Sequence, residues 1–278
     1  MDQLSSRIDI NVLRQVAPYA PSKKVGAQAT ILRSLSMVLP ELLASISIDT
    51  SLRISHFLAQ ICHESDGFCA IEEYASGQDY EGRADLGNTK PGDGVRYKGR
   101  SPLQLTGRGN YRAFTAWMRK RNPGCPDFEA EPALVATWPW AGWAMIYFWD
   151  VKKLNAVADR DDLVALTRVI NGGKNGLADR AACLTRAKLA VGNLAGNMQT
   201  AQQGSIALVR GMSGDAVEWL QRALQASGYY LLSIDGQFGA GTEAALKAFQ
   251  RANGLTVDGI AGRDTRAALL TYASEAKP

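Results

Sequence analysis

The sequence predicts a mainly helical protein with one large domain followed by a small three-helix domain. Three observations predict this class. A chain of 278 residues that is 46% hydrophobic can bury a full core and suits one large domain plus a small one. Apolar residues recur at helical spacing in several long stretches, and a turn followed by a helix is repeated near the end of the sequence.

In the large domain, several stretches carry the helical pattern of apolar residues. They are residues 25–39, 52–61, 133–149, 163–170 and 181–194. Residues 77–100 are instead rich in glycine, charge and turn residues, so we expect a loop with a short hairpin that forms one wall of a cleft. The helical spacing of four tryptophans favours core packing over stacking on a ligand. They are Trp138, Trp140, Trp143 and Trp149.

A composition shift marks the boundary of the large domain. Residues 196–205 are mostly polar and uncharged, which is typical of a flexible linker. We therefore predict a first domain over 1–198, a linker over 199–207 and a second domain over 208–278.

The second domain contains an internal repeat. Residues 235–246 recur 23 residues later as residues 258–269. Each copy has Asp-Gly in a turn, a second glycine, a threonine placed to cap or join the first helical turn, and an Ala-Leu stripe. With the amphipathic stretch 216–224 before them, the two copies predict three helices.

The net charge of +4 lies in the first part of the chain, because the residues from 209 onward carry seven basic and seven acidic side chains. A mild positive field favours approach to an anionic polymer but is too weak to indicate nucleic acid. No apolar run of about 20 residues and no secretory signal are visible, so we expect no stable membrane insertion. We expect the protein to stay in the cytoplasm until it is released.

The cysteines and histidines predict no metal site and no cofactor. The cysteines lack metal-type spacing, and a cytosolic chain favours free buried thiols over disulfides. They are Cys62, Cys69, Cys125 and Cys183. His56 and His63 lie seven residues apart, and two helical turns are too long for two ligands of one zinc ion.

Glu64 and Glu73 are the strongest candidates for a catalytic pair. Glu64 follows the helix predicted over 52–61, and Glu73 comes nine positions later, beyond a turn that contains Gly67. If the chain reverses there, the two carboxyl groups can face each other across a cleft. Cleavage of a glycosidic bond uses such a pair, because one carboxylic acid protonates the leaving oxygen and one carboxylate acts from the opposite face.

Two other carboxylates compete with Glu73 for the second position. Glu72 is its neighbour, and Glu81 lies in the loop that forms the cleft wall. Neighbouring residues of an extended segment point to opposite faces, so Glu72 and Glu73 cannot both hold one water. We expect one of these two to pair with a base such as Arg100. The choice among the three carboxylates stays open at this point.

Four blocks of sequence, in order along the chain, carry a family resemblance. They are residues 52–61, 63–67, 97–111 and 169–173. They resemble the glycoside hydrolase family 19 group, the lysozyme-like chitinases, and most closely its phage and prophage endolysin branch, over about the first 195 residues. The resemblance implies a two-lobed helical fold of the lysozyme type. It also implies Glu64 as general acid, Glu73 as the base that activates water, and an inverting mechanism.

The resemblance implies roles for further residues. Thr106 matches a hydroxyl residue that holds the attacking water together with the base, and its alternative role is to cap the following helix. Gln104, Asn110 and Asn171 match positions that line the sugar-binding cleft. Arg180 matches an arginine near the acid, and we group it with the substrate-binding residues.

The chain departs from the family pattern at two glycines. Asp66 replaces one in the block that contains Glu64, and Ser101 replaces another in the block that contains Gln104. We expect Asp66 to add negative charge close to the acid. Ser101 is expected to alter the local backbone fit.

The repeat in the second domain closely resembles the peptidoglycan-binding domain type 1 module, which implies a cell-wall anchor. Together the resemblances imply a monomeric endolysin that hydrolyses β-1,4 bonds between N-acetylated amino sugars of bacterial peptidoglycan, acting in the periplasm after release. One alternative is a chitinase that cleaves a polymer of N-acetylglucosamine, and the wall-binding repeat argues against it. Another is a wall-binding structural protein without catalysis, and the presence of Glu64, Glu73 and Thr106 argues against that.

Overall fold

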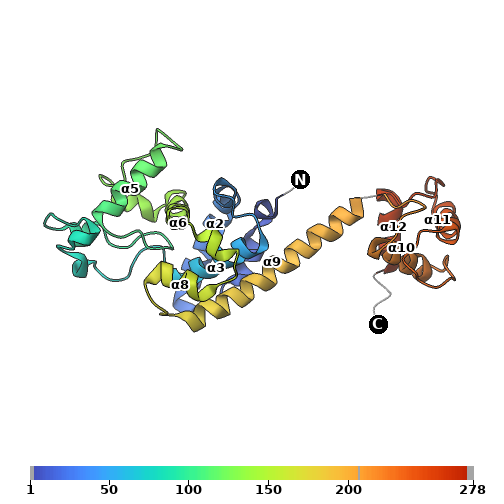
Figure 1. Ribbon diagram of the computed structural model, residues 1–278, viewed down its shortest axis with the longest axis horizontal. Helices are drawn as coiled ribbons and strands as arrows, with labels where there is room; N and C mark the ends of the chain where they lie inside the picture. Colours follow the sequence, from blue (N-terminus) through green and yellow to red (C-terminus); the bar gives the residue numbers. More distant parts are fainter. Residues whose placement is uncertain (1–2, 206, 274–278) are drawn as a thin grey trace. The chain divides into compact units, whose positions relative to one another are not determined.

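The computed structural model of the chain describes residues 3–205 and 207–273 and consists of two compact units (Figure 1). The first is Met1–Ala195 and the second is Gly196–Pro278. Both are built from helices, and within the described residues the only β-pairing consists of isolated bridges. The predicted mainly helical class is confirmed. No described helix is both long enough and apolar enough to cross a membrane.

The first unit contains most of the helices, and every predicted helical stretch falls on one or more of them. The α-helices are α1 (Ile10–Val16), α2 (Val25–Ser45), α3 (Ser51–Glu64), α4 (Asp93–Arg96), α5 (Arg108–Arg119), α6 (Trp140–Val151), α7 (Leu154–Ala158), α8 (Leu163–Asn171) and α9 (Leu177–Ser205). Short 3-10 helices cover Leu4–Arg7, Ser22–Lys24, Gln78–Tyr80, Ala84–Leu86 and Pro132–Ala136.

Helix α3 lies in the middle of the larger core of this unit. It begins at Thr50, whose hydroxyl accepts the N–H of Arg53 at 3.2 Å and so caps the first turn. Its apolar residues from Ile54 to Cys62 are fully buried, and the ring of Phe57 packs edge to face against Trp149 at 5.1 Å. Because the core fixes α3, the residues at its end have a defined position.

Two hydrophobic cores give the first unit two lobes, as the resemblance implied. The larger core joins residues of α1, α2, α3, α6 and α9, and the smaller one joins aromatic residues of α5 and α6 with Tyr97 and Phe128. Helix α6 serves both, since Trp149 belongs to the first core and Tyr147 to the second. All four tryptophans pack in or against these cores, so the predicted core packing is confirmed.

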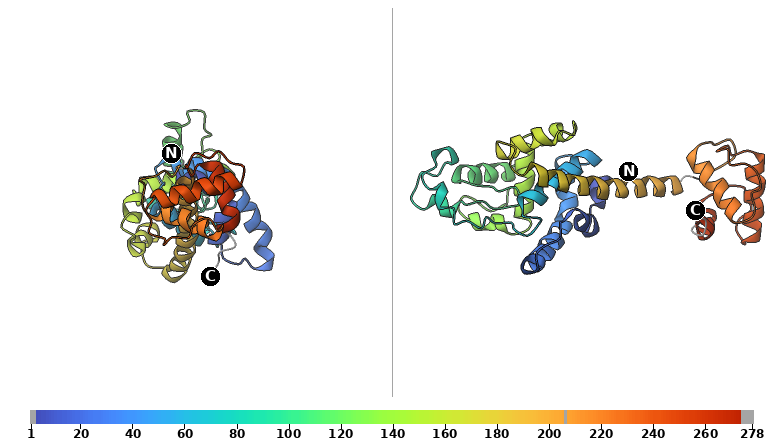
Figure 2. Two further views of the ribbon diagram at one scale, coloured as in Figure 1. Left: turned by 90° about the vertical axis from the view of Figure 1, so that its right-hand side faces the viewer. Right: turned by 90° about the horizontal axis from the view of Figure 1, so that it is seen from below.

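Two expectations differ from the structure in this unit. The stretch 133–149 is interrupted, because Pro139 is the N-cap of α6 and proline cannot continue a helix. The loop expected over 77–100 holds two 3-10 turns and α4, and its pairing is limited to isolated bridges such as Glu72 with Arg100. Figures 1 and 2 show this loop with α5 at one end of the unit and α2 and α3 at the other.

The segment expected as a linker, 199–207, is helical as far as Ser205, because α9 continues through it. Its alanines and glutamines are good helix formers, and no proline interrupts them. Residue 206 lies outside the described residues. The domain boundaries at 198 and 208 stay predictions, and the compact units divide at Ala195.

The second unit has the three predicted helices, α10 (Asp215–Ala226), α11 (Ala240–Ala252) and α12 (Arg263–Ala273). They surround a core of its own that includes Leu220, Leu246 and Phe249.

A buried glutamine in the helix before each copy explains the sequence repeat. Nε2 of Gln221 donates to Oδ1 of Asp235 at 2.7 Å and to the hydroxyl of Thr242 at 3.2 Å, and its Oε1 accepts the N–H of Gly236. Gln250 makes the same bonds to Asp258, Thr265 and Gly259 in the second copy. The repeated threonine therefore bonds to the preceding helix, and Thr242 does not cap its own.

Candidate active site

A tight left-handed turn separates Glu64 from Glu73. Glu64 is the last residue of α3, and the turn consists of Asp66, Gly67 and Phe68, with φ angles of 53°, 66° and 64°. This backbone suits glycine, is tolerated by aspartate and is strained for phenylalanine. The hydroxyl of Tyr74 donates to Oδ2 of Asp66 at 2.9 Å, which ties the turn to the residue after Glu73. The chain therefore reverses between the two carboxylates, as predicted.

Glu64 is held by a buried arginine. Nη2 of Arg180 forms an ion pair with Oε1 of Glu64, and Nη1 of Arg180 donates to Oε1 of Gln60, one turn earlier on α3. The side chain of Arg180 is 2% exposed and that of Glu64 is 19% exposed. Arg180 is thus too deeply buried to contact a sugar, which corrects its grouping with the substrate-binding residues. Within the described residues, Oε2 of Glu64 makes no hydrogen bond.

The loop between α8 and α9 lies against the end of α3. Asn171 ends α8, and its Nδ2 donates to the carbonyl of Asn175 at 2.8 Å. A Cβ atom on Gly176 would lie 2.3 Å from the ring of His63, the residue before Glu64. Asn171 therefore shapes a loop beside the acid, and its amide nitrogen is engaged within that loop.

Glu73 is held by neutral donors. Its Oε1 accepts from the hydroxyl of Tyr80 at 3.0 Å, and its Oε2 accepts from the N–H of Gly99 at 3.1 Å. Its own N–H donates to the carbonyl of Gly99 at 2.9 Å, so backbone and side chain both dock on one segment. Burial and the Glu73 carboxylate raise the pKa of Tyr80, which keeps this hydroxyl a donor. Lys98 donates to the Glu73 carbonyl at 3.2 Å.

Gln104 shares the space against Gly99 with Glu73. A Cβ atom on Gly99 would lie 2.0 Å from Oε1 of Gln104 and 3.1 Å from Oε2 of Glu73. The turn that carries Gln104 is left-handed at both ends, with φ of 75° at Ser101 and 51° at Gln104. Ser101 is buried and its hydroxyl donates to the carbonyl of Ala141 at 2.9 Å. The structure thus brings the predicted cleft residue Gln104 to the predicted base.

Thr106 and Asn110 lie farther along the same segment. The N-cap of α5 is Gly107, so Thr106 does not cap this helix. The hydroxyl of Thr106 donates to the carbonyl of Gln104 at 3.4 Å, and Nδ2 of the exposed Asn110 donates to the carbonyl of Thr106 at 2.7 Å. No hydrogen bond joins Thr106 to Glu73 among the described residues. Their shared hold on one water stays a prediction.

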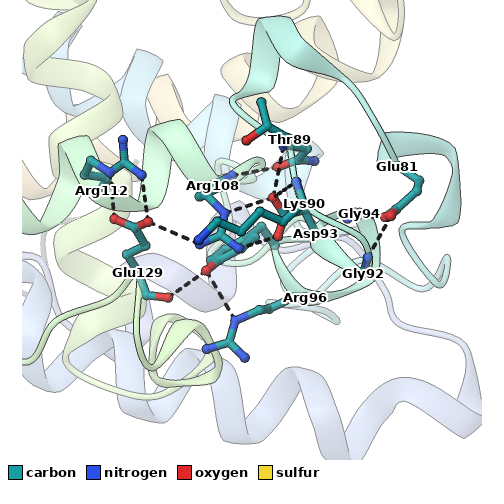
Figure 3. A network of polar contacts seen from close by, with 12 residues as sticks. Glu81, Thr89, Lys90, Gly92, Asp93, Gly94, Arg96, Arg108, Arg112 and Glu129 are labelled. Carbon is teal, nitrogen blue, oxygen red and sulfur yellow. Dashed lines mark hydrogen bonds and ion pairs between the residues drawn. The ribbon is translucent and has the colours of Figure 1, made fainter.

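The two competing carboxylates are engaged elsewhere. Oε1 of Glu72 accepts from Nε of Arg100 at 3.0 Å, which is the pairing expected for one of the two neighbours. The two oxygens of Glu81 accept the N–H groups of Gly92 at 2.7 Å and Gly94 at 2.8 Å (Figure 3). Glu81 therefore fixes the backbone of the wall loop.

A charged network braces this wall (Figure 3). Arg108 pairs with both oxygens of Asp93 and contacts Glu129 at 3.2 Å, and Glu129 also pairs with Arg112 at 2.7 Å. The Arg108 guanidinium lowers the pKa of Asp93 to about 2, and Arg112 with Arg108 lowers that of Glu129 to about 2. A pocket of about 770 Å³ lies beside the network, and none of the predicted site residues lines it.

Sequence reasoning missed three residues of the site, namely Gln60, which binds Arg180, and Tyr80 and Gly99, which bind Glu73. Gln60 lies one turn before Glu64 and is a polar residue between the apolar Ala59 and Ile61, which is a readable signal. Tyr80 and Gly99 reach Glu73 through irregular backbone, and no periodicity marks them.

The chain is similar to a family of peptidoglycan-binding domains and to glycosidase relatives. A family model described as "Putative peptidoglycan binding domain" matches residues 213–269. A glycosyl hydrolase family 19 domain-containing protein of Haemophilus influenzae is 29% identical over 155 residues, 45% of this chain and 72% of that protein. An endochitinase of Arabidopsis thaliana is 34% identical over 122 residues, 44% of this chain and 40% of that protein.

A shorter similarity joins the chain to other enzymes. A spore cortex-lytic enzyme of Bacillus cereus is 48% identical over 61 residues, 22% of this chain and 24% of that enzyme. Two of these three relatives are thus matched over less than half of their length. The 155-residue match is longer than the whole second unit, so it includes part of the first unit. These similarities confirm the predictions of a glycoside hydrolase and of a peptidoglycan-binding module.

Proposed function

We propose that the chain is an endolysin of phage or prophage origin that hydrolyses β-1,4 bonds between N-acetylated amino sugars of peptidoglycan. One observation carries the proposal: a carboxylate held by a cation and a carboxylate held by neutral donors flank one tight turn, in a chain that also bears a peptidoglycan-binding module. Glycosidic hydrolysis needs two carboxyl groups with different tasks.

Glu64 suits the general acid. Arg180 orients the carboxyl group through Oε1, while Oε2 has no partner in the described structure and can carry a proton to a leaving oxygen. Glu64 is on α3 and its partner Arg180 is on α9, so the fold preorganises the donor. A well-placed group avoids the cost of orientation during the reaction.

Glu73 suits the base that activates water. The hydroxyl of Tyr80 and the N–H of Gly99 leave lone pairs on both oxygens for a water molecule. Glu72 and Glu81 are engaged by Arg100 and by the wall backbone, which supports Glu73 over both. In an inverting enzyme the two carboxyl groups stand about 6.5 to 9.5 Å apart to leave room for that water.

The remaining site residues line the proposed cleft. Gln104 lies against the base, and we propose that Thr106 helps it to hold the attacking water. The exposed Asn110 and the loop shaped by Asn171 contribute amide groups that can bind hydroxyl and acetamido groups of the sugar. The second unit would tether the enzyme to the wall and raise the local substrate concentration. We propose that it acts in the periplasm after release from the host cytoplasm.

The products of purified peptidoglycan test this function. Mass spectrometry of fragments released by the protein should show new reducing ends on an amino sugar, and it distinguishes N-acetylmuramic acid from N-acetylglucosamine. The E64Q variant should release none. Fragments with new peptide ends and intact glycan strands would contradict the proposal.

Chitinase activity is the second candidate, because the Arabidopsis relative is an endochitinase. Hydrolysis of N-acetylglucosamine oligomers and of peptidoglycan should be compared at equal enzyme concentration. We expect faster cleavage of peptidoglycan, and we expect deletion of residues 208–278 to slow cleavage of intact wall more than of short oligomers. Equal slowing of both would remove the anchor from the proposal.

A further inference from the structure

Cys62 and Cys183 are in contact beside the candidate acid. Cys62 is on α3, two residues before Glu64, and Cys183 is on α9, three residues after Arg180. Both side chains are buried as free thiols, and their sulfur atoms are 3.0 Å apart. A disulfide bond is about 2.0 Å long, so the two sulfurs need to approach by only about 1 Å.

One cation faces both sulfur atoms. Nη2 of Arg186 lies 3.2 Å from the sulfur of Cys183 and 3.9 Å from that of Cys62, while its Nε donates to the carbonyl of Val16 at 2.7 Å. A fixed guanidinium beside a thiol stabilises the thiolate, which is the reactive form. The hydrogen bond between the two sulfurs lowers the pKa of Cys183, and the same contact together with burial raises that of Cys62. Because the guanidinium lies closer to its sulfur, Cys183 is the nucleophile of the pair.

A pocket gives a small reagent access to the pair. It has a volume of about 320 Å³ and is lined by Cys62, Cys183 and Cys69, among other residues. A water molecule occupies about 30 Å³ in the liquid, so the pocket can hold a small molecule next to the sulfurs. The sulfur of Cys69 donates to the carbonyl of Gly67 at 3.8 Å and has no sulfur partner in the described structure.

We propose that Cys62 and Cys183 are a modification site, which a disulfide oxidant converts to a disulfide bond that links α3 to α9 beside Glu64. The Cys183 thiolate attacks one sulfur of the oxidant and releases the first thiol. Cys62 then gives up its proton, attacks the Cys183 sulfur of the mixed disulfide and releases the second thiol. The protein loses two protons and two electrons in all, and the oxidant takes them up to become two thiols.

The bond has a structural consequence that does not depend on which glycosidic bond the enzyme cleaves. It closes a loop of about 120 residues, and long loops constrain the unfolded chain most. It also fixes the contact between α3 and α9 that aligns Arg180 with Glu64. The link fits an enzyme that leaves a reducing cytoplasm, because disulfides persist in oxidising compartments.

The test uses the full chain and a small disulfide, cystamine. After equilibration, remaining thiols are alkylated, and intact mass and peptide mapping follow. We expect a loss of two hydrogen masses, alkylation of Cys69 and Cys125 only, and one linked peptide pair that contains Cys62 and Cys183. The melting temperature should rise by about 5 °C or more, and dithiothreitol should reverse both changes.

Three variants serve as controls. C69S removes a cysteine of the same pocket and should oxidise as the unaltered chain does. C62S and C183S should each form no internal bond and show no rise in melting temperature on oxidation. Four alkylated cysteines in the oxidised unaltered chain, a retained cystamine adduct on Cys183, or a link to Cys69 would each overturn the proposal. These measurements on the unaltered chain decide the question even if a serine variant folds poorly.

Discussion

The two candidate carboxylates differ in what holds them. Glu64 ends a core helix and pairs with Arg180, a buried cation from a second helix. Glu73 lies in irregular backbone and accepts only from neutral groups, the hydroxyl of Tyr80 and the N–H of Gly99. Breaking a buried ion pair costs more than losing one neutral hydrogen bond. The position of the acid therefore depends on the helical core, whereas the position of the base depends on the local backbone of the wall.

The largest effect is expected on the acid side. Glu64→Gln keeps an oxygen for Arg180 but cannot donate a proton, so lysis should fall by about 100-fold to 10,000-fold or more. Turbidity loss of permeabilised cells measures activity, and circular dichroism checks the fold, which should remain. Lysis near the level of the unaltered enzyme would remove Glu64 from the mechanism.

On the base side, activity should fall while the fold is unaffected. Glu73→Gln and Thr106→Val should each lower turnover much more than sugar binding, by roughly 100-fold or more for the glutamate. Each substitution should raise the free energy of activation. If both residues hold one water, the rise in the double variant should be far smaller than the sum of the two single rises.

Glu72→Gln and Glu81→Gln are the controls for this comparison, since Arg100 and the wall backbone engage these carboxylates. Both should retain most activity in the same turnover assay. An inactive Glu81→Gln together with an active Glu73→Gln would move the base to the wall loop.

The buried ion pair on the acid side should contribute strongly to the stability of the fold. Arg180→Met leaves the Glu64 carboxylate and the buried Gln60 without their partner, which should lower the free energy of unfolding by about 3 kcal/mol. Arg53→Met is a matched control, because Arg53 on α3 also pairs with a carboxylate, that of the more exposed Asp159. Its cost should stay below about 1 kcal/mol in the same urea titration. Equal costs would show that burial of the ion pair is unimportant.

In the wall loop we expect a smaller effect on stability, and this effect depends on pH. Arg108 lowers the pKa of Asp93 to about 2 in the folded protein, below its unfolded value, so the carboxylate stabilises the fold above about pH 4. This contribution, about 2 kcal/mol, is lost as the pH falls from about 4 to 2. Asp93→Asn should therefore lower stability at pH 7 and have little effect near pH 2. Asp85→Asn, at an exposed pair, should leave the urea-unfolding profile unchanged at both pH values.

The features that could be predicted from the sequence are those marked by the spacing of apolar residues or by a local turn. The helices with long apolar stripes and the three helices of the second unit follow from spacing, and Glu64 follows from its place at the end of one such helix. The turn at Gly67 supplied the reversal toward Glu73. Each of these features depends on residues that are close in sequence.

Features that depend on distant contacts could not be predicted. The burial of Arg180 results from the packing of α9 on α3, and no local pattern separates a buried arginine from an exposed one. The hold of Tyr80 and Gly99 on Glu73 and the contact of Cys62 with Cys183 require the folded backbone. The helical end of the expected linker shows that a polar composition does not exclude helix when its residues are good helix formers.

The smallest effect concerns Ser101, on the base side, where the family pattern has glycine. Its φ of 75° costs a residue with a Cβ atom about 1 to 2 kcal/mol, while its hydroxyl gains a hydrogen bond to Ala141 worth about 1 kcal/mol. Ser101→Gly relieves the strain but loses the bond and adds freedom to the unfolded chain, so stability should change by less than about 1 kcal/mol. Ser101→Ala loses the bond and keeps the strain.

Alanine at position 101 should therefore be more destabilising than glycine, the reverse of the order found inside helices and strands. Urea unfolding of the two variants measures the difference directly. Because this turn carries Gln104 against Gly99 and Glu73, the same order should appear in lysis rates if the base depends on local backbone. If alanine were tolerated better than glycine in both assays, the left-handed backbone at Ser101 would not be what fixes this side of the site.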